Sequence, residues 1–297
     1  MQKQRTGTML AILAAALYAL NAPFSKALLS HAGPTMMAAF LYLGAGLGLL
    51  LWGGIGKALG KDPVRAPLTR KELPYTLAMI LLDIAAPILL MLGITRTIAA
   101  NASLLNNFEI VATSLIALLI FKELISRRLW LAIGLTSLAS AILGFQGSGS
   151  FSFDLGSVFV LGACICWGFE NNCTRMLSSK SSVQITVIKG CFSGLGSLLV
   201  ARLLGEEFPR LLPLLCILAL GFVAYGLSIN FYIMAQSHLG AAKTSAFYSI
   251  APFLGVAFSM VLGERPGLQF YLGLAVMVLA TWLMIRDTLE IPNTAVE

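Results

Sequence analysis

The sequence predicts an all-α membrane protein in which ten transmembrane helices form two inverted repeats of five helices each. Three observations lead to this fold class: the composition, ten apolar segments of bilayer-spanning length, and an alignment of one half of the chain with the other. Apolar residues make up 58% of the chain, charged residues only 11%, and the mean hydropathy is +0.87. Because a soluble domain has roughly 25% charged residues, this chain has too little polar surface for water.

Ten apolar segments follow one another, and most reach the roughly 20 residues that a helix needs to cross the hydrocarbon. Each is expected to be helical, because a helix satisfies its own backbone groups in lipid. The polar, flexible stretch 146–150 separates the halves and predicts repeats of 1–148 and 149–297. The ten segments are 7–29, 34–56, 73–95, 98–120, 128–147, 154–177, 182–203, 212–235, 241–262 and 267–286.

The two halves align with each other at several points. Five spans in each half is an odd number, so the second copy enters the membrane upside down. Inverted repeats place a substrate site at their interface and provide alternating access, which indicates a transporter. The aligned pairs are Tyr18 with Trp167, Asn21 with Glu170, Lys26 with Arg175, Ala99–Ser103 with Gly240–Thr244, and Glu123 with Glu264.

The distribution of basic residues predicts the orientation. With the N-terminus inside, 14 of the 20 lysines and arginines fall in inside segments and 4 in outside segments, while Lys26 and Lys189 lie within spans. This bias favours a cytoplasmic location for both termini, and it fits an even number of spans. The expected location of the protein is the cell inner membrane. The first apolar segment is long enough to span the membrane and is expected to remain as the first helix.

Composition also argues against other classes of partner. The net charge of +7 does not gather into a stripe or a tail, so no nucleic-acid partner is expected. The five cysteines all fall inside predicted spans, which favours buried small residues over disulfides or metal ligands. No cofactor or metal is expected. The expected partners are a small-molecule substrate, protons and the lipid bilayer, for a monomer or a homodimer.

The second half carries motifs of a known repeat. Phe231–Ala235, Gly240–Ala242, Ala251–Phe253 and Leu262–Arg265 resemble the signature of the EamA family of the drug/metabolite transporter superfamily. The first half is a weaker copy that ends in Phe121-Lys122-Glu123 and has Val111 where the family usually has proline. The resemblance implies a ten-helix bundle around a central cavity and export of small metabolites, amino acids or drugs.

Charged groups within spans are functional candidates, because each costs roughly 2.5 to 3.5 kcal/mol at a helix centre. Asp83 and Glu109 lie at the middle of spans 3 and 4, Glu170 in span 6 and Lys189 in span 7. Lys26 lies near the outer end of span 1, where it can reach the interface, and is discounted. Since spans 3 and 4 are antiparallel, Asp83 is predicted to neighbour Glu109 and to titrate with it.

Two polar stripes run along predicted helix faces. Asn106, Glu109 and Thr113 share one face of span 4, and the equivalent set in span 6 shares another. A polar stripe can hold two helices together through hydrogen bonds. The carboxylate in each stripe favours the alternative that the stripe lines a cavity. The span 6 set consists of Trp167, Glu170, Asn171 and Thr174.

Lys189 is expected to be structural. It lies about seven residues from the cytoplasmic end of span 7, and Glu170 lies equally deep in the adjacent antiparallel span 6. An ion pair would lower the burial cost of both groups, and it competes with a substrate role for Glu170.

Aromatic and proline residues complete the candidate site. Tyr18, Trp167 and Tyr248 can stack on an organic substrate or bind a cation through a ring face, although such residues are more often packing or interfacial anchors. Three prolines remove a backbone donor and predict helix kinks near the transport pathway. They are Pro23, Pro87 and Pro252.

These residues predict a secondary active transporter that exports a small metabolite, an amino acid or a drug-like cation. No Walker motif is present, so coupling to protons through a mid-membrane carboxylate is the natural energy source. A passive channel and a membrane enzyme remain alternatives. The enzyme is the weaker one, because His31 and His238 lie in loops on opposite sides without spaced acidic partners.

Overall fold

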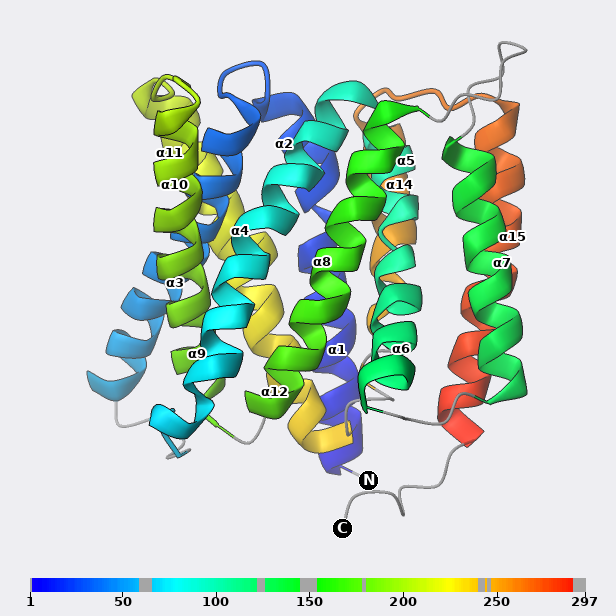
Figure 1. The fold of residues 1–297 in the computed structure, drawn as a ribbon, viewed down its shortest axis with the longest axis horizontal. Coiled ribbons are helices and arrows are strands. Elements are labelled where there is room, and N and C mark those ends of the chain that lie inside the picture. The colour runs from blue at the N-terminus through cyan, green and yellow to red at the C-terminus, as the bar shows by residue number, and fades with distance from the viewer. Residues whose placement is uncertain are drawn as a thin grey trace.

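The computed structural model describes residues 2–58, 66–121, 126–144, 154–177, 180–239, 244 and 247–290. It is all-helical over these residues (Figure 1). The first half contains α1 (Gln2–Ala19), α2 (Asn21–Leu28), α3 (Pro34–Ala58), the 3₁₀ turn η1 (Arg70–Glu72), α4 (Leu73–Arg96), α5 (Ala99–Leu105), α6 (Phe108–Phe121) and α7 (Arg127–Gly144). The second half contains α8 (Leu155–Leu177), α9 (Ser182–Ile188), η2 (Lys189–Ser193), α10 (Gly194–Leu203), α11 (Leu211–Gly221), η3 (Phe222–Leu227), α12 (Ser228–Leu239), α14 (Ala251–Val261) and α15 (Leu268–Glu290).

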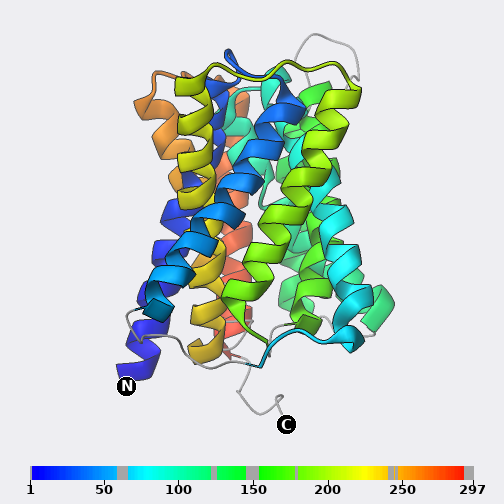
Figure 2. The same cartoon turned by 90° about the vertical axis from the view of Figure 1, so that its left-hand side faces the viewer.

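Ten passes follow from these elements, as the sequence predicts. Six continuous or nearly continuous helical stretches are long and apolar enough to cross a bilayer, and shorter apolar helices lie in the fifth, ninth and tenth passes. The sixth pass is α8, a helix of 23 residues. The start of α1 and the end of α15 lie at the same end of the bundle, which we call the terminal end (Figure 2). The opposite end is called the distal end. The predicted boundary between residues 148 and 149 lies outside the described residues.

Several passes are interrupted where the sequence predicts single helices. The first pass breaks at Leu20, between α1 and α2, and the fourth breaks at Asn106–Asn107, between α5 and α6. The seventh and eighth passes each contain a π-helical segment, η2 and η3. Such wide turns release the regular i to i−4 bonding and often mark functional sites.

Helix packing follows the inverted symmetry of the repeats. The first pass packs on the eighth through α1 and α12, as the sixth packs on the third through α8 and α4. Likewise α1 contacts α14 as α8 contacts α6, while the passes α5 and α14, and α7 and α15, pair across the symmetry axis. Figure 1 shows the α7–α15 pair at one edge of the bundle. The two halves are therefore interleaved, and their shared interface forms the core.

Small residues allow α3 to lie close to the seventh and eighth passes. A Cβ on Gly46 would lie 2.5 Å from the backbone nitrogen of Cys191 in η2, and a Cβ on Gly221 would lie 2.1 Å from the carbonyl oxygen of Leu41. Neither position can carry a side chain without moving backbone atoms. This is the close helix approach expected of glycine-rich faces in lipid, and it holds η2 and η3 against Tyr42 on α3.

Two carboxylates join separate passes at the distal end. Glu206, which follows α10, accepts hydrogen bonds from the backbone nitrogens of Thr35 (3.1 Å) and Met36 (2.6 Å) at the start of α3. Glu264, which follows α14, accepts bonds of 2.9 Å from the nitrogens of Ala99 and Ala100 at the start of α5. A carboxylate satisfies the unpaired donors of a helix N-terminus and complements its dipole.

Replacing Glu206 by alanine is expected to lower stability by about 1 kcal/mol, the usual cost of a lost helix N-cap. The reason is that two amide donors of α3 then lose their partner. The measurement is the thermal unfolding midpoint of the purified protein. Glu207→Ala is the matched control, since Glu207 is the exposed neighbour. Equal midpoints for the two variants would show that the cap does not stabilise the fold.

Candidate functional site

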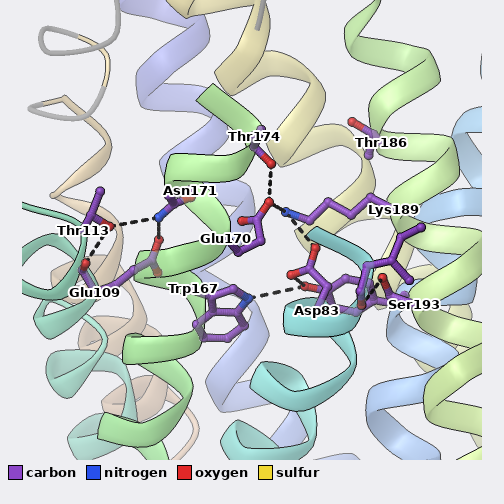
Figure 3. A network of polar contacts seen from close by, with 12 residues as sticks. Asp83, Glu109, Thr113, Trp167, Glu170, Asn171, Thr174, Thr186, Lys189 and Ser193 are labelled. Carbon is purple, nitrogen blue, oxygen red and sulfur yellow. Dashed lines mark hydrogen bonds and ion pairs between the residues drawn. The ribbon is translucent and has the colours of Figure 1, made fainter. Parts of the chain in front are cut away.

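The candidate residues gather into two polar clusters on two sides of α8 (Figure 3). One is an ion cluster formed by Asp83, Glu170 and Lys189. The other is the Glu109 cluster, formed by Glu109, Thr113 and Asn171. The predicted stripe on span 6 is therefore divided. Glu170 and Asn171 are consecutive residues, and their side chains belong to different clusters.

The ion cluster is buried and centred on Lys189. Its Nζ lies 3.1 Å from Oδ2 of Asp83 and 3.0 Å from Oε1 of Glu170. The exposed fractions of Asp83 and Glu170 are 0% and 1%, and that of Lys189 is 6%. The predicted contact between Glu170 and Lys189 is thus present, and Asp83 adds a second carboxylate. Two carboxylates around one ammonium leave the cluster with one formal negative charge when all three groups are ionised.

Hydrogen bonds orient both carboxylates. The Tyr42 hydroxyl donates to Oδ1 of Asp83 at 2.8 Å, and the Trp167 indole nitrogen donates to the Tyr42 oxygen at 3.5 Å. The Thr174 hydroxyl donates to Glu170. Buried charges are tolerated where partners of this kind satisfy their remaining lone pairs. Lys189 begins the π-helical turn η2, which projects its side chain toward α4 and α8.

The expectation that Asp83 neighbours Glu109 is wrong. Asp83 contacts Lys189 and Tyr42, whereas Glu109 contacts Asn171, and Figure 3 shows Trp167 and Glu170 between them. The physical reason is that α4 and α6 both pack along α8. The third and fourth passes follow each other in the sequence, but α8 of the sixth pass lies between α4 and α6.

Glu109 lies in the first turn of α6, directly after the break in the fourth pass. Its Oε1 accepts a hydrogen bond of 2.7 Å from Nδ2 of Asn171, which also lies 3.3 Å from the Thr113 hydroxyl. The Thr113 hydroxyl donates to the Glu109 carbonyl at 2.8 Å. Over the described residues the other carboxylate oxygen has no hydrogen-bond or ion-pair partner. Glu109, Thr113 and Asn171 are each half-buried, so this cluster is more accessible than the ion cluster.

A narrow pocket lies one helical turn from Glu109. The Glu109 backbone nitrogen donates to the Asn106 carbonyl at 3.1 Å, and Asn106 lines the pocket together with Tyr18, Asn21 and Pro252. Its volume is about 10 Å³, which is room for a single water. Ser103 also lines it, and the Ser103 hydroxyl, itself buried, has no hydrogen-bond partner among the described residues.

Five tyrosines form a continuous cluster beside this pocket, which we call the tyrosine cluster. Neighbouring ring centroids lie 5.2 Å apart for Tyr42 and Tyr225, 5.8 Å for Tyr225 and Tyr18, 5.7 Å for Tyr18 and Tyr248, and 4.9 Å for Tyr248 and Tyr232. The Tyr225 hydroxyl accepts a 2.9 Å bond from Nδ2 of Asn21, so Asn21 faces the tyrosine cluster as well as the pocket.

Sequence reasoning missed Tyr42 and Lys26, as well as Tyr225 and Tyr232 of the tyrosine cluster. Tyr42 lies in an apolar, glycine-rich helix with no polar neighbour at helical spacing, so periodicity gave no signal. Lys26 was discounted, but its Nζ donates to the carbonyls of Ile94 (2.5 Å) and Thr97 (2.7 Å) at the end of α4. A lysine that donates to the last carbonyls of a helix is a stabilising cap. This contact could have been predicted only from the knowledge that spans 1 and 3 approach each other at the distal end.

The three prolines occupy different settings. Pro23 lies in α2, just after the break at Leu20, and Pro87 lies inside α4, which continues through it. Pro252 lies in the first turn of α14, where a missing donor costs nothing, so it does not interrupt a helix. The break before Pro252 is the turn at Ser249–Ile250.

Comparisons with known proteins agree with this architecture. The profile of the EamA-like transporter family matches residues 5–145 and, a second time, residues 154–286. An uncharacterized transporter of Methanothermobacter thermautotrophicus is 26% identical over 294 residues, covering 92% of this chain and 84% of that protein. The uncharacterized transporter YyaM of Bacillus subtilis is 22% identical over 214 residues, covering 69% of this chain and 70% of that protein.

A solved crystal structure shares the fold, with a TM-score of 0.70 at 15% identity, and the match covers 97% of this chain and 98% of the other. At this identity the match bears on the fold alone. The family match, by contrast, spans both repeats of the ten-pass bundle. The chain therefore belongs to the EamA-like transporter family, within the drug/metabolite transporter superfamily.

Proposed function

We propose that the protein is a secondary active transporter that exports a small organic molecule in exchange for protons, with Glu109 as the exchanging carboxylate. The ion cluster of Asp83, Glu170 and Lys189 is then a structural element that holds α8 in place. The protein lies in the cell inner membrane with both termini in the cytoplasm, so that the terminal end of the bundle faces the cytoplasm.

The observation that carries this proposal is the setting of Glu109. It is a carboxylate within a membrane span, it is half-buried, and one of its oxygens has no partner over the described residues. An ionisable group in this position is energetically costly, which makes it a functional candidate. The buried cation of the neighbouring ion cluster, Lys189, is already bound to two other carboxylates. Glu109 is therefore free to bind either a proton or a substrate group.

Exchange of substrate for protons follows if the proton and the substrate bind in turn to the same carboxylate, that of Glu109. The groups that act on Glu109 are Asn171 by its hydrogen bond, and Glu170 and Lys189 through their charges. The Glu109 charge in turn acts on the hydroxyl groups of Tyr18, Tyr225 and Tyr248 and on the Cys164 thiol. A proton that neutralises Glu109 weakens its hold on a polar substrate, so a proton gradient can drive the substrate out by alternating access.

The packing of the distal end suits one state of such a cycle. There α2, α5 and α14 pack on one another, and Glu264 and Lys26 bridge separate passes. In the other half of the bundle, α6 packs mainly on α8, and α1 packs mainly on α12. This supports a conformation closed at the distal end, with the accessible side of Glu109 turned toward the terminal end.

The test is transport in proteoliposomes. A thermal-shift screen of the purified protein against metabolites selects a stabilising compound, whose uptake is then measured with and without a pH gradient. A proton-coupled carrier gives saturable uptake that the gradient accelerates, together with substrate-induced proton movement. Saturable uptake indifferent to the gradient would reject the coupling, and uptake that stays linear with concentration would indicate a channel.

The proposed orientation predicts the location of reporters fused to the chain. A reporter inserted at Gly149 is expected to be periplasmic and one fused after Arg286 cytoplasmic, because basic residues concentrate on the cytoplasmic side. The measurement is the activity of a reporter that works on only one side of the membrane. Both reporters on the same side would contradict the ten-pass topology, and exchanged sides would contradict the orientation.

A further inference from the structure

The tyrosine cluster has a deep end and an accessible end. Tyr42 and Tyr225 are buried, with exposed fractions of 1% and 2%, and their hydroxyls are engaged with Asp83 and Asn21. Tyr18, Tyr232 and Tyr248 are half-buried. The second set therefore presents ring surface that a ligand can reach, while the first set fixes the position of the rings behind it.

The accessible end lies beside Glu109. Tyr18 lines the narrow pocket with Asn106, and Asn106 is one helical turn before Glu109. Tyr248 packs against Tyr18, with ring centroids 5.7 Å apart. A partly exposed carboxylate and partly exposed aromatic rings thus share one region between the two repeats. The narrow pocket holds no more than a water, so a ligand would occupy the accessible surface next to it.

When its acidic and basic groups are all ionised, this region carries a net negative charge. It contains three buried or half-buried carboxylates, of Asp83, Glu109 and Glu170, against the single ammonium of Lys189. That ammonium is bound to two of the three, which leaves Glu109 without a cation among the described residues. Lys26, the other lysine within a predicted span, donates its hydrogen bonds to carbonyls at the end of α4 and does not pair with Glu109.

From this arrangement we infer that the substrate is an organic monocation with an aromatic or apolar body, whose charged group lies between the Glu109 carboxylate and the ring faces of Tyr18 and Tyr248. Ring faces attract cations, most strongly where water is excluded. The inference rests on the proposed function and names the substrate class of the same site. A substrate carboxylate would find no available cation here, which disfavours organic anions and zwitterions.

The experiment compares ligands that carry the same ring and different charge. Binding to the purified protein is measured by isothermal titration calorimetry with benzyltrimethylammonium, 3-phenylpropionate, phenylalanine and 3-phenylpropanol. Benzyltrimethylammonium keeps its charge at every pH, so only groups of the protein titrate. Saturable binding of benzyltrimethylammonium alone, or at least about tenfold more tightly than the others, is the expected result.

Variants then assign the binding to the named groups. Glu109→Gln is expected to weaken benzyltrimethylammonium binding by roughly tenfold or more, because the charge is lost while the shape is kept. Tyr248→Leu is expected to weaken it by roughly two- to thirtyfold, the range of a cation–π contact, whereas Tyr248→Phe keeps the ring face and is expected to bind nearly normally. Glu207→Gln, at the exposed distal end, is the control for charge in general.

Three outcomes would overturn the inference: no saturable binding of the cation at millimolar concentration, equal or tighter binding of the anion, the zwitterion phenylalanine or the neutral alcohol, or unchanged cation binding in Glu109→Gln. A protein that binds the cation but shows no coupling to a pH gradient would refute the proposed proton exchange and leave the substrate class intact. A gradient-driven carrier that prefers 3-phenylpropionate would refute the substrate class and leave the proposed proton exchange intact.

Discussion

Lys189→Met is expected to destabilise the protein more than the loss of either carboxylate that Lys189 contacts. The substitution keeps most of the side-chain volume but leaves Asp83 and Glu170 buried without their shared ammonium. Breaking a buried pair in this way costs about 3–5 kcal/mol, because an uncompensated charge stays behind. By contrast, Glu170→Gln leaves Lys189 bound to Asp83, and Asp83→Asn leaves it bound to Glu170. The thermal unfolding midpoints should therefore rank the lysine variant lowest.

A triple variant, a change of pH and a surface variant provide the controls for this prediction. The triple variant Asp83→Asn/Glu170→Gln/Lys189→Met removes all three charges and is expected to recover part of the loss. Acidic pH should narrow the gap between Lys189→Met and the native protein, since a carboxylate that takes up a proton no longer needs the ammonium. Lys180→Met is the matched surface control, because Lys180 pairs with Glu72 at 3.3 Å where both side chains contact solvent, and exposed pairs contribute little. A Lys189→Met midpoint equal to that of the native protein would show that the ion cluster does not support the fold.

The fold was predictable because its signals are long-range and redundant. Ten apolar segments, the charge bias and the internal alignment each bear on the same architecture, so errors at segment ends do no harm. The symmetric packing of α1 on α12 and of α8 on α4 is what an odd-span repeat requires. The breaks within passes were not predictable from composition. The one at Asn106–Asn107 has no proline, and the π-helical segments consist of residues that also suit a regular helix.

Within the site, the sequence predicted the contact between Glu170 and Lys189, whose spans are neighbours in the sequence and whose side chains meet in the bundle. Glu170 and Lys189 are equally distant from the same membrane boundary, and the lysine side chain is long enough to span the gap, so the depth argument predicted their contact correctly. The same argument failed for Asp83 and Glu109 because α8 lies between α4 and α6. Depth can be read from sequence, but the order of helices around the bundle cannot be deduced from sequence adjacency. Tyr42 and the tyrosine cluster depend on that order.

Glu109→Gln is expected to leave the protein folded and to abolish transport driven by a pH gradient. The amide is nearly isosteric with the carboxyl group and can still accept the hydrogen bond from Asn171, so the Glu109 cluster should persist. What it loses is the ability to exchange a proton. The measurement is substrate uptake in proteoliposomes with an imposed gradient, together with the unfolding midpoint, which should stay close to that of the native protein.

Two further variants separate coupling from structure. Glu109→Asp keeps a titratable group and is expected to retain coupled uptake at a lower rate, because the shorter side chain moves the carboxylate away from Asn171. Asp83→Asn is expected to lower stability while uptake by the folded fraction stays coupled to the gradient, since Asp83 is fully buried against Lys189. If Glu109→Gln transports normally across a range of pH, then Glu109 is a protonated packing residue, and the coupling must reside in another group.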